Sequence, residues 1–465
     1  MNFYCIYVSL LAIGLQDAKT TMHTEGTRFI LYFTEGSRVT LPARPLHLYF
    51  TTRSSNEITV RATSPSYTDG VKVNETIRLT SSTPAVVPIA AALRTTEFGN
   101  ETKVILVEST GLISVYGLNP SANQAALFTV LPVTALGTEY IFPSLTAFNI
   151  PSQGFMGIVT QEDQTSFEVF LSSSSQKSIA SIRGIEYPPR SVIRATLNKY
   201  EVSEIRQIPN CPDCDLTGSR ISASKPIAVF STVALTNPVN DGGGGDLLVE
   251  QLVPLSLWGR SYITQSPPEN SLVSVNIFAS VCDAQNIYIN KTKTPTWRAL
   301  GTTGYVVANE KIPNTGFHLV DSGIEKLNVR FGGYVYGQGE ASAYAAPLAM
   351  EGGSPVGNFP WADPDAVAVH QANLASTDRI QQQIWRLKEK NLLSVYKPLR
   401  ESVVFSKFSC LDSCKKLPSC LYASIEKENN KIRCRLFDER SRCDPKMKKP
   451  GVRTYVSRIT FWTQI

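Results

Sequence analysis

The chain has 465 residues, of which 42% are hydrophobic and 18% charged, and its net charge is +6. This composition is that of a globular protein without a long low-complexity tract, and the length suggests two to four domains. Four histidines leave few candidates for imidazole chemistry.

The N-terminus has the pattern of a secretory signal peptide. Residues 2–15, "NFYCIYVSLLAIGL", are apolar, uncharged and too short to span a bilayer, and small residues stand at plausible cleavage positions, Ala12/Gly14 or Ala18. We therefore expect residues 1–18 to be removed, with a buried N-terminal strand as the alternative. No later stretch approaches 18 apolar residues, so we expect a secreted, extracellular chain without a transmembrane segment.

Short β-branched and aromatic runs follow, separated by Gly, Pro, Asn and Ser. They are "RFILYF" (28–33), "EITVRA" (57–62), "KVILVE" (103–108), "SFEVFL" (166–171), "SLVSVNIFA" (271–279) and "NIYIN" (286–290). Amphipathic helices are scarce, and "IAAALR" (89–94) is at most one or two turns. The pattern predicts a mainly β fold of tandem antiparallel β-sandwich-like units.

The β-rich region contains an internal duplication. "LPVTALGTEYI" (131–141) aligns without gaps to "VPLSLWGRSYI" (253–263), and "VESTGLISVYG" (107–117) aligns to "ISASKPIAVFS" (221–231). Residues 328–349 resemble a third, weaker copy. We expect repeats over 28–150 and 151–348, with Leu136 and Trp258 in corresponding cores. Replacing a buried Trp258 by Ala should then cost about 3–5 kcal/mol.

The glycine run in "NDGGGGDLLVEQLVPL" (240–255) is not a phosphate-binding loop. Gly242–Gly245 are contiguous and no Gly-Lys-Ser/Thr follows. The duplication explains the run as an expanded loop tip in the second copy. Asp241, Asp246 and Glu250 could hold Ca²⁺, but a solvated acidic loop is the favoured interpretation, and we expect no bound metal.

Several dispersed blocks carry a family resemblance. "LGTEYI", "DLTGSRISASKPIAVFS" (215–231), "LLVEQLVPLSLWGRSYI" and "YVYGQGEASAYAAPLA" resemble the N-terminal domain of the IgG Fc-binding protein family over residues 28–348. The resemblance implies a secreted, mucus-associated, non-enzymatic protein with a role in recognition or adhesion. Whether immunoglobulins are bound is left open.

An extracellular location makes the cysteines interpretable as disulfides. Eight remain after the signal peptide: Cys211, Cys214, Cys282, Cys410, Cys414, Cys420, Cys434 and Cys443. The "CPDC" motif at 211–214 lacks the context of a redox or zinc site, which favours a structural bridge, either local or to Cys282. Asn74, Asn100 and Asn290 begin glycosylation sequons.

A change in composition divides the chain. Residues 349–384 are rich in Gly, Pro and Asp and are predicted to be a linker. From Trp385 onward, 19 basic and 8 acidic residues give a net charge of +11, whereas the preceding residues carry −5. Two regions of different chemistry are therefore joined.

The C-terminal region resembles a PAN/Apple module over residues 385–463. The resemblance rests on "SCLDSCKKLPSCLYASIEKENNKIRCRLFD" (409–438), in which two cysteines stand four apart on an expected short helix. It implies an α+β module with Cys410 paired to Cys434 and Cys414 to Cys420. Cys443 has no partner within the module, and a bridge to Cys282 or to another chain would satisfy it.

Basic residues of this module form a candidate site for acidic glycans. They are Lys415, Lys416, Arg433, Arg435, Lys446, Lys448, Lys449 and Arg453. A solvated basic face is the alternative, because residues on opposite faces of a sheet cannot form one patch.

Enzymatic activity is not expected. No nucleophile elbow, zincin motif or P-loop occurs, and His23, His47, His318 and His370 are isolated in the sequence. We expect a non-enzymatic protein without cofactors or nucleic-acid partners that binds extracellular glycoproteins or glycans. A structural matrix component is the alternative, and a secreted hydrolase the third.

Overall fold

The computed structural model describes residues 24–350 with gaps, and four strands near the C-terminus at 400–404, 422–428, 431–437 and 453–456. The gaps are 35–43, 68–69, 71, 96–99, 121–124, 145–153, 173–178, 183, 209–210, 212–213, 237–245, 266–271, 292–294, 301–302, 314–316, 323–328 and 339–342. Within these described parts the chain forms strands and four 3₁₀ helices but no α-helix, which confirms the predicted mainly β fold.

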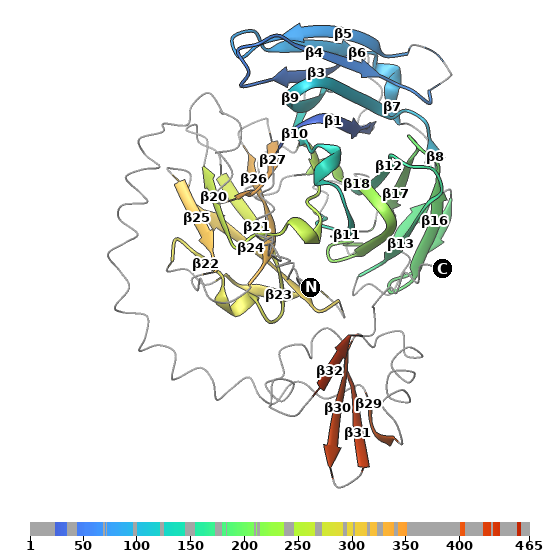
Figure 1. Cartoon of the computed structure of the whole chain (residues 1–465), viewed down its shortest axis with the longest axis vertical. Coiled ribbons are helices and arrows are strands. Elements are labelled where there is room, and N and C mark those ends of the chain that lie inside the picture. Colours follow the sequence, from blue (N-terminus) through green and yellow to red (C-terminus); the bar gives the residue numbers. More distant parts are fainter. Residues whose placement is uncertain are drawn as a thin grey trace, which may run out of the picture.

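The strands from β1 to β19 fall into two groups, which we name the first and second β units (Figure 1). The first unit contains β1 (Glu25–Leu31), β2 (Phe33–Thr34), β3 (Leu46–Thr51), β4 (Ile58–Thr63), β5 (Asn74–Leu79), β6 (Ala85–Ile89), η1 (Ala91–Leu93), β7 (Arg94–Thr95), β9 (Ile105–Pro120) and β10 (Ala125–Val130). The short strand β8 (Asn100–Glu101) lies between β7 and β9 in the chain but pairs with β17 of the second unit. The second unit follows η2 (Val133–Ala135) and contains β11 (Gly137–Ile141), β12 (Gly154–Thr160), β13 (Thr165–Phe170), β14 (Ala180–Ile182), β15 (Ile185–Tyr187), β16 (Val192–Leu197), β17 (Val202–Gln207), β18 (Arg220–Thr236) and β19 (Asp246–Gln251).

The third β unit follows η3 (Leu255–Leu257). It contains β20 (Ser261–Gln265), β21 (Leu272–Ser280), η4 (Ala284–Asn286), β22 (Tyr288–Ile289), β23 (Trp297–Ala299), β24 (Tyr305–Ile312), β25 (Phe317–Asp321), β26 (Phe331–Gln338), β27 (Ala343–Pro347) and β28 (Ala349–Met350). Near the C-terminus, β29 (Arg400–Val404), β30 (Tyr422–Glu428), β31 (Lys431–Phe437) and β32 (Arg453–Val456) form an antiparallel sheet in the order β29-β31-β30-β32.

One long strand organises each of the first two units. Along β9, β1 and β4 pair with the first half, and β3 and β10 pair with the second half. Along β18, β13 pairs with the first half, and β12 and β19 pair with the second. Each long strand therefore belongs to both layers of its unit. The third unit instead has two separate sheets, β22-β25-β20-β28 and β23-β24-β21-β26-β27.

The sequence alternation explains the strands. On β4, Ile58, Val60 and Ala62 are buried, whereas the residues between them face outward. Period-two burial of β-branched residues is what a half-buried antiparallel strand requires. The same pattern places the expected runs 57–62 and 166–171 in β4 and β13.

Equivalent hydrogen bonds confirm the internal duplication. In the second unit, Gly137 N donates to Tyr140 Oη, which donates to the carbonyl of Ile227 on β18. In the third unit, Gly259 N donates to Tyr262 Oη, which donates to the carbonyl of Phe331 on β26. The aligned sequence blocks thus occupy the same place in two similarly built units.

The first unit is a third member of this series. Gly26 pairs with Ile113 of β9, as Gly137 pairs with Ile227 of β18 and Gly259 with Phe331 of β26. The duplication detected from sequence did not include the "EGTRFIL" segment (25–31). Phe29 stands there in place of the tyrosine, so the hydroxyl that marks the motif is absent.

Neighbouring units share hydrophobic cores. The core of the first unit includes Val159, Phe230 and Val249 of the second unit. The core of the second unit includes Phe278, Tyr334 and Tyr336 of the third. The return strands β10, β19 and β27, one from each unit, also lie against one another. The three units therefore form a single packed body.

Candidate interaction face

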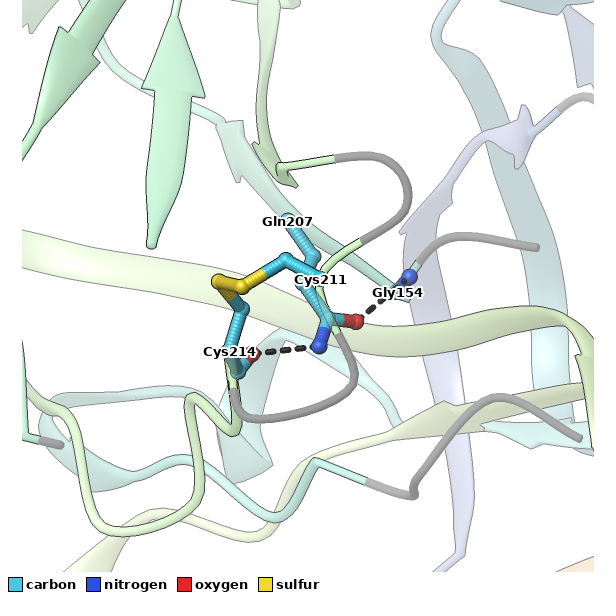
Figure 2. The surroundings of a disulfide bond; sticks show 4 residues. All are labelled: Gly154, Gln207, Cys211 and Cys214. Atoms are coloured by element: carbon cyan, nitrogen blue, oxygen red, sulfur yellow. Dashed lines mark hydrogen bonds between the residues drawn. A yellow bond between two sulfur atoms is a disulfide. The ribbon is translucent and has the colours of Figure 1, made fainter. Parts of the chain in front are cut away.

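The "CPDC" motif forms a local disulfide (Figure 2). Cys211 and Cys214 are bonded with their Cα atoms 5.3 Å apart, and Cys214 is fully buried. Gln207 at the end of β17 donates from Nε2 to the carbonyl of Cys214 and accepts at Oε1 from Gly154 N at 3.1 Å. The bridge is therefore tied to the start of β12. Cys282 is also disulfide-bonded, but not to this pair.

The described histidines lie apart from one another. His318 is 3% exposed, its Nε2 lies 2.9 Å from the Pro313 carbonyl oxygen, and its Nδ1 lies 3.1 Å from Nδ2 of Asn290. A neutral ring with its proton on Nε2 satisfies both contacts. His47 is half-buried on β3 of the first unit. Among the residues that the structure describes, no three His, Cys, Asp or Glu side chains are grouped as metal ligands would be.

Glu250 corrects an expectation. The sequence favoured a solvated acidic loop containing Asp241, Asp246 and Glu250, but Glu250 lies on β19 with 2% of its surface exposed. Neither carboxylate oxygen has a hydrogen-bond partner, and burial raises the pKa of Glu250 well above its usual value. The solvated-loop interpretation is therefore wrong for Glu250, because the strand turns it into the core of the second unit. Asp241 lies outside the described residues.

The glycosylation sequons differ in their surroundings. Asn74 is exposed at the start of β5. Asn100 begins β8, which pairs with β17. Asn290 is exposed, but its Oδ1 accepts from Leu319 N at 2.9 Å while its Nδ2 contacts His318. The amide of Asn290 therefore links β22 to β25 in the folded chain.

The C-terminal sheet gives the register of three candidate glycan-binding residues. Arg433 pairs with Val403 and Glu426, and Arg435 pairs with Glu401 and Ser424. Arg453 pairs with Ile425, which is one residue out of step with these partners. In the register of the sheet, Arg453 is therefore one position out of phase with Arg433 and Arg435.

The remaining predicted positions of this module lie outside the described residues. They are Lys415, Lys416, Lys446, Lys448 and Lys449 of the basic set, and Cys410, Cys414, Cys420 and Cys443 of the disulfide set. The signal peptide, His23, His370 and residues 351–384 of the predicted linker also lie outside.

The outward face of the first unit is apolar over four adjacent strands. One row across β6, β3, β9 and β10 consists of Val86, Tyr49, Tyr116 and Thr129. The next row consists of Pro88, His47, Leu118 and Leu127. We call these eight residues the apolar face. None of them carries a formal charge at neutral pH with histidine neutral.

Seven of the eight residues of the apolar face are at least partly exposed to solvent, and Thr129 is buried. Val86 is 50% exposed and Leu127 is 44% exposed. Pro88 is exposed as well, and the histidine, both tyrosines and Leu118 are half-buried. A contiguous exposed apolar surface of this kind marks an interaction site, and tyrosine is enriched in such sites.

Other outward faces have the polar chemistry that water favours. On β13 and β16, Glu168 and Arg194 lie opposite each other and form an ion pair, with Arg194 Nε 2.8 Å from Glu168 Oε1. On β5, exposed Arg78 forms an ion pair with Glu57 at 3.2 Å. The apolar face thus differs from these charged outward faces. The sequence did not reveal it, because its residues are ordinary residues of a β-strand.

Comparisons with known proteins connect part of the chain to one family. Residues 126–337, which extend from β10 into β26, match the family model described as IgGFc binding protein. The human IgGFc-binding protein is 32% identical over 162 residues, which are 34% of this chain and 3% of that relative. No solved structure matches the chain. The expected family resemblance is therefore confirmed for residues 126–337, and the PAN/Apple resemblance stays a prediction.

Proposed function

We propose that this chain is a secreted, non-enzymatic recognition protein that binds extracellular glycoproteins or their glycans. The observation that carries the proposal is the match of residues 126–337 to the IgGFc-binding family. The matched residues include the whole second β unit and most of the third. A binding role therefore falls on the packed β body.

Immunoglobulin binding is not part of the proposal. The human relative is named for IgG Fc binding, but the aligned segment is 3% of its length. A shared fold supports a shared type of scaffold, while ligand choice depends on a few surface residues.

Secretion is supported by three features of different kinds. The first is the apolar, uncharged stretch at 2–15, and the second is the exposed sequon at Asn74. The third is the bridge between Cys211 and Cys214, because structural disulfides persist in oxidising compartments. Within the described residues, no helix has the length and apolar character to cross a bilayer.

We propose that the chain has no catalytic activity, because the buried titratable side chains of His318 and Glu250 lie in different β units. His318 is buried in the third unit, with both ring nitrogens engaged by Pro313 and Asn290. Glu250 is buried on β19 of the second unit. General acid–base work needs such groups to be within hydrogen-bond reach of each other or of a substrate.

The test is binding of the full-length secreted chain to a glycan array and to immobilised extracellular glycoproteins. Saturable binding to a defined glycan or glycoprotein supports recognition. Binding to none of them contradicts the proposal, and turnover of a polysaccharide substrate would establish a hydrolase instead.

A structural role in a secreted matrix is the second candidate. The apolar face favours it, because an assembling protein needs a surface that is buried only after association. A matrix protein would assemble at rising concentration without any added ligand, whereas a recognition protein would require the glycan or glycoprotein.

A further inference from the structure

The second β unit buries the surface that corresponds to the apolar face. The equivalence follows from the pairing of Gly26 with Ile113 and Gly137 with Ile227, which aligns Tyr116 with Phe230. Phe230 is fully buried and packs edge-on against Tyr32 and Phe128 of the first unit, with ring centroids 5.3 and 6.1 Å away.

Polar contacts complete this first junction. Glu204 on β17 accepts from Thr95 Oγ1 of the first unit at 2.7 Å and from the neighbouring Arg206. Gln251 on β19 accepts at Oε1 from Leu131 N at 2.8 Å. Both carboxylate and amide oxygens accept at the boundary between the two units, so this face of the second unit is a built interface.

The third unit uses the same face against the second unit. Tyr334 is the equivalent of Phe230, because Phe331 occupies the position of Ile227. Tyr334 is 4% exposed, belongs to the core of the second unit, and accepts at Oη from Val253 N at 3.1 Å. Leu131 and Val253 occupy aligned positions in the repeated blocks, so the two junctions are constructed alike.

The first unit has the equivalent face, but most of that face is not packed against another described β unit. β10 lies against β27 of the third unit, and Thr129 on β10 is 7% exposed. Val86 and Leu127 are nevertheless 50% and 44% exposed. At the position equivalent to Leu127 the second unit has Val249, which is 4% exposed in the junction. Of the three equivalent faces, one in each β unit, the apolar face of the first unit is therefore the one that is exposed to solvent.

We propose that the apolar face binds a second copy of this chain, face to face, as a symmetric dimer. In the second and third units, the equivalent face packs against a neighbouring β unit of the same protein. A surface of this type is therefore suited to packing against another β unit of this fold. A charge-free face can meet a copy of itself without leaving a buried charge unpaired.

The core of the third unit does not offer an alternative partner surface. Val275, Ile277 and Phe331 in that core are fully buried within their own sheets. A head-to-tail contact, in which the third unit of one copy covers the first unit of the next, has no open core to use. The symmetric contact of two apolar faces remains, with the sheets packed as in a β-sandwich.

The first experiment measures the mass of the full-length glycosylated chain by sedimentation equilibrium over a wide concentration range. The wild type is expected to shift from monomer to dimer as concentration rises. Leu127→Asp and Val86→Asp should each weaken the association at least about tenfold, because a carboxylate would be buried without a partner. Ile185→Asp is the matched control, since Ile185 is 59% exposed on β15 of the second unit and its replacement should leave association unchanged.

A measurement without substitutions covers the case in which the variants fail to fold. Hydrogen exchange of the wild type at low and high concentration should show slower exchange in β3, β6, β9 and β10 at high concentration, and no change in β13 or β16. A monomer at every concentration overturns the proposal, and so does a dimer that persists in both Asp variants. Capture of a different protein by a monomeric wild type assigns the face to that partner instead.

The dimer does not rest on the proposed recognition of glycoproteins. Glycan or glycoprotein binding by Leu127→Asp should remain at the level of Ile185→Asp. A monomeric wild type that still binds a glycan contradicts the dimer alone, and a dimer that binds none contradicts the recognition function alone.

Discussion

A single tyrosine hydroxyl secures the start of the second and of the third unit. Tyr140 Oη accepts from Gly137 N at 2.9 Å and donates to the Ile227 carbonyl at 2.6 Å, and Tyr140 is fully buried. Burial raises the pKa of Tyr140 above its usual value, so the hydroxyl keeps its proton and can donate. Phe29 fills the equivalent place in the first unit, so the ring fits that site without the hydroxyl.

Tyr140→Phe should lower the free energy of unfolding by about 1–3 kcal/mol. The ring is retained, but the Gly137 amide and the Ile227 carbonyl lose a buried partner. Urea denaturation checks the change. Tyr49→Phe is the control, because Tyr49 is only half-buried, whereas Tyr140 is fully buried. Equal stability of Tyr140→Phe and the wild type would contradict the structural role of the hydroxyl.

Glu250→Gln should stabilise the protein at neutral pH and remove part of its pH dependence. The pKa of Glu250 is raised in the folded state, so the folded protein retains a proton that the unfolded chain loses above about pH 4.5. The free energy of unfolding therefore falls as pH rises from that value to the folded-state pKa, by up to about 1.4 kcal/mol per pH unit.

Denaturation of wild type and Glu250→Gln from pH 4 to pH 8 measures this difference. The two free energies should converge near the acid end of the range and separate as pH rises. Glu168→Gln is the control, because the Glu168 side chain is 50% exposed beside Arg194. A Glu250→Gln variant that loses stability at pH 7 would show that the ionised carboxylate has a stabilising partner.

At the scale of elements, register limits which basic residues can act together in the C-terminal sheet. Arg433 is opposite Glu426, and Arg435 is opposite Glu401. Opposite charges at adjacent positions of one face reduce the local positive potential. We therefore propose that an acidic-glycan site of this module depends on Lys446, Lys448 and Lys449 more than on the arginines of β31.

Retention on heparin, compared with a cation exchanger of equal charge density, tests this proposal. Wild type should elute from heparin at the higher salt concentration. Lys446/Lys448/Lys449→Ala should remove the difference, while Arg433/Arg435→Ala should largely retain it. Elution of wild type at the same salt from both columns would indicate generic charge attraction, which weakens as the Debye length falls to about 8 Å.

At the scale of the whole molecule, shared cores make the three units dependent on one another. Phe230 of the second unit is part of the first core, and Tyr334 of the third is part of the second. In such a repeat, the outer face of one unit completes the core of its neighbour. Loss of the neighbour would therefore expose that outer face to water. The three units should therefore unfold and resist proteolysis together.

The linker was predicted at 349–384, but Ala349 and Met350 form β28 of the third unit. Limited proteolysis should therefore cut the chain within 351–384 before it separates the units. A stable fragment covering approximately residues 28–348 is the expected product. Cys282 is disulfide-bonded, and the proposed partner is Cys443. The fragments should then stay together on a non-reducing gel and separate after reduction. An early cut between the second and third units would contradict the shared-core interpretation.

Local chemistry determined much of this architecture in advance. The runs 57–62, 166–171 and 271–279 overlap β4, β13 and β21 to within one residue at each end, because alternation and β-branched composition act over a few residues. The aligned blocks around Tyr140 and Tyr262 predicted the duplication, because each unit needs the same glycine and aromatic residue at its start. The starting segment of the first unit, residues 25–31, was not detected, because Phe29 stands where the aligned blocks have a tyrosine.

Burial of whole faces depends instead on which unit lies against which. Phe230 and Tyr116 are aromatic residues at equivalent positions of equivalent strands, yet Phe230 is fully buried and Tyr116 belongs to an open face. Both read as ordinary strand residues in the sequence. Only the tertiary structure shows that the core of the first unit covers Phe230, while none of the described β units covers Val86 and Leu127 in the same way. Period-two patterning specifies two faces of a strand, but contacts between distant segments decide whether the second face meets water or protein.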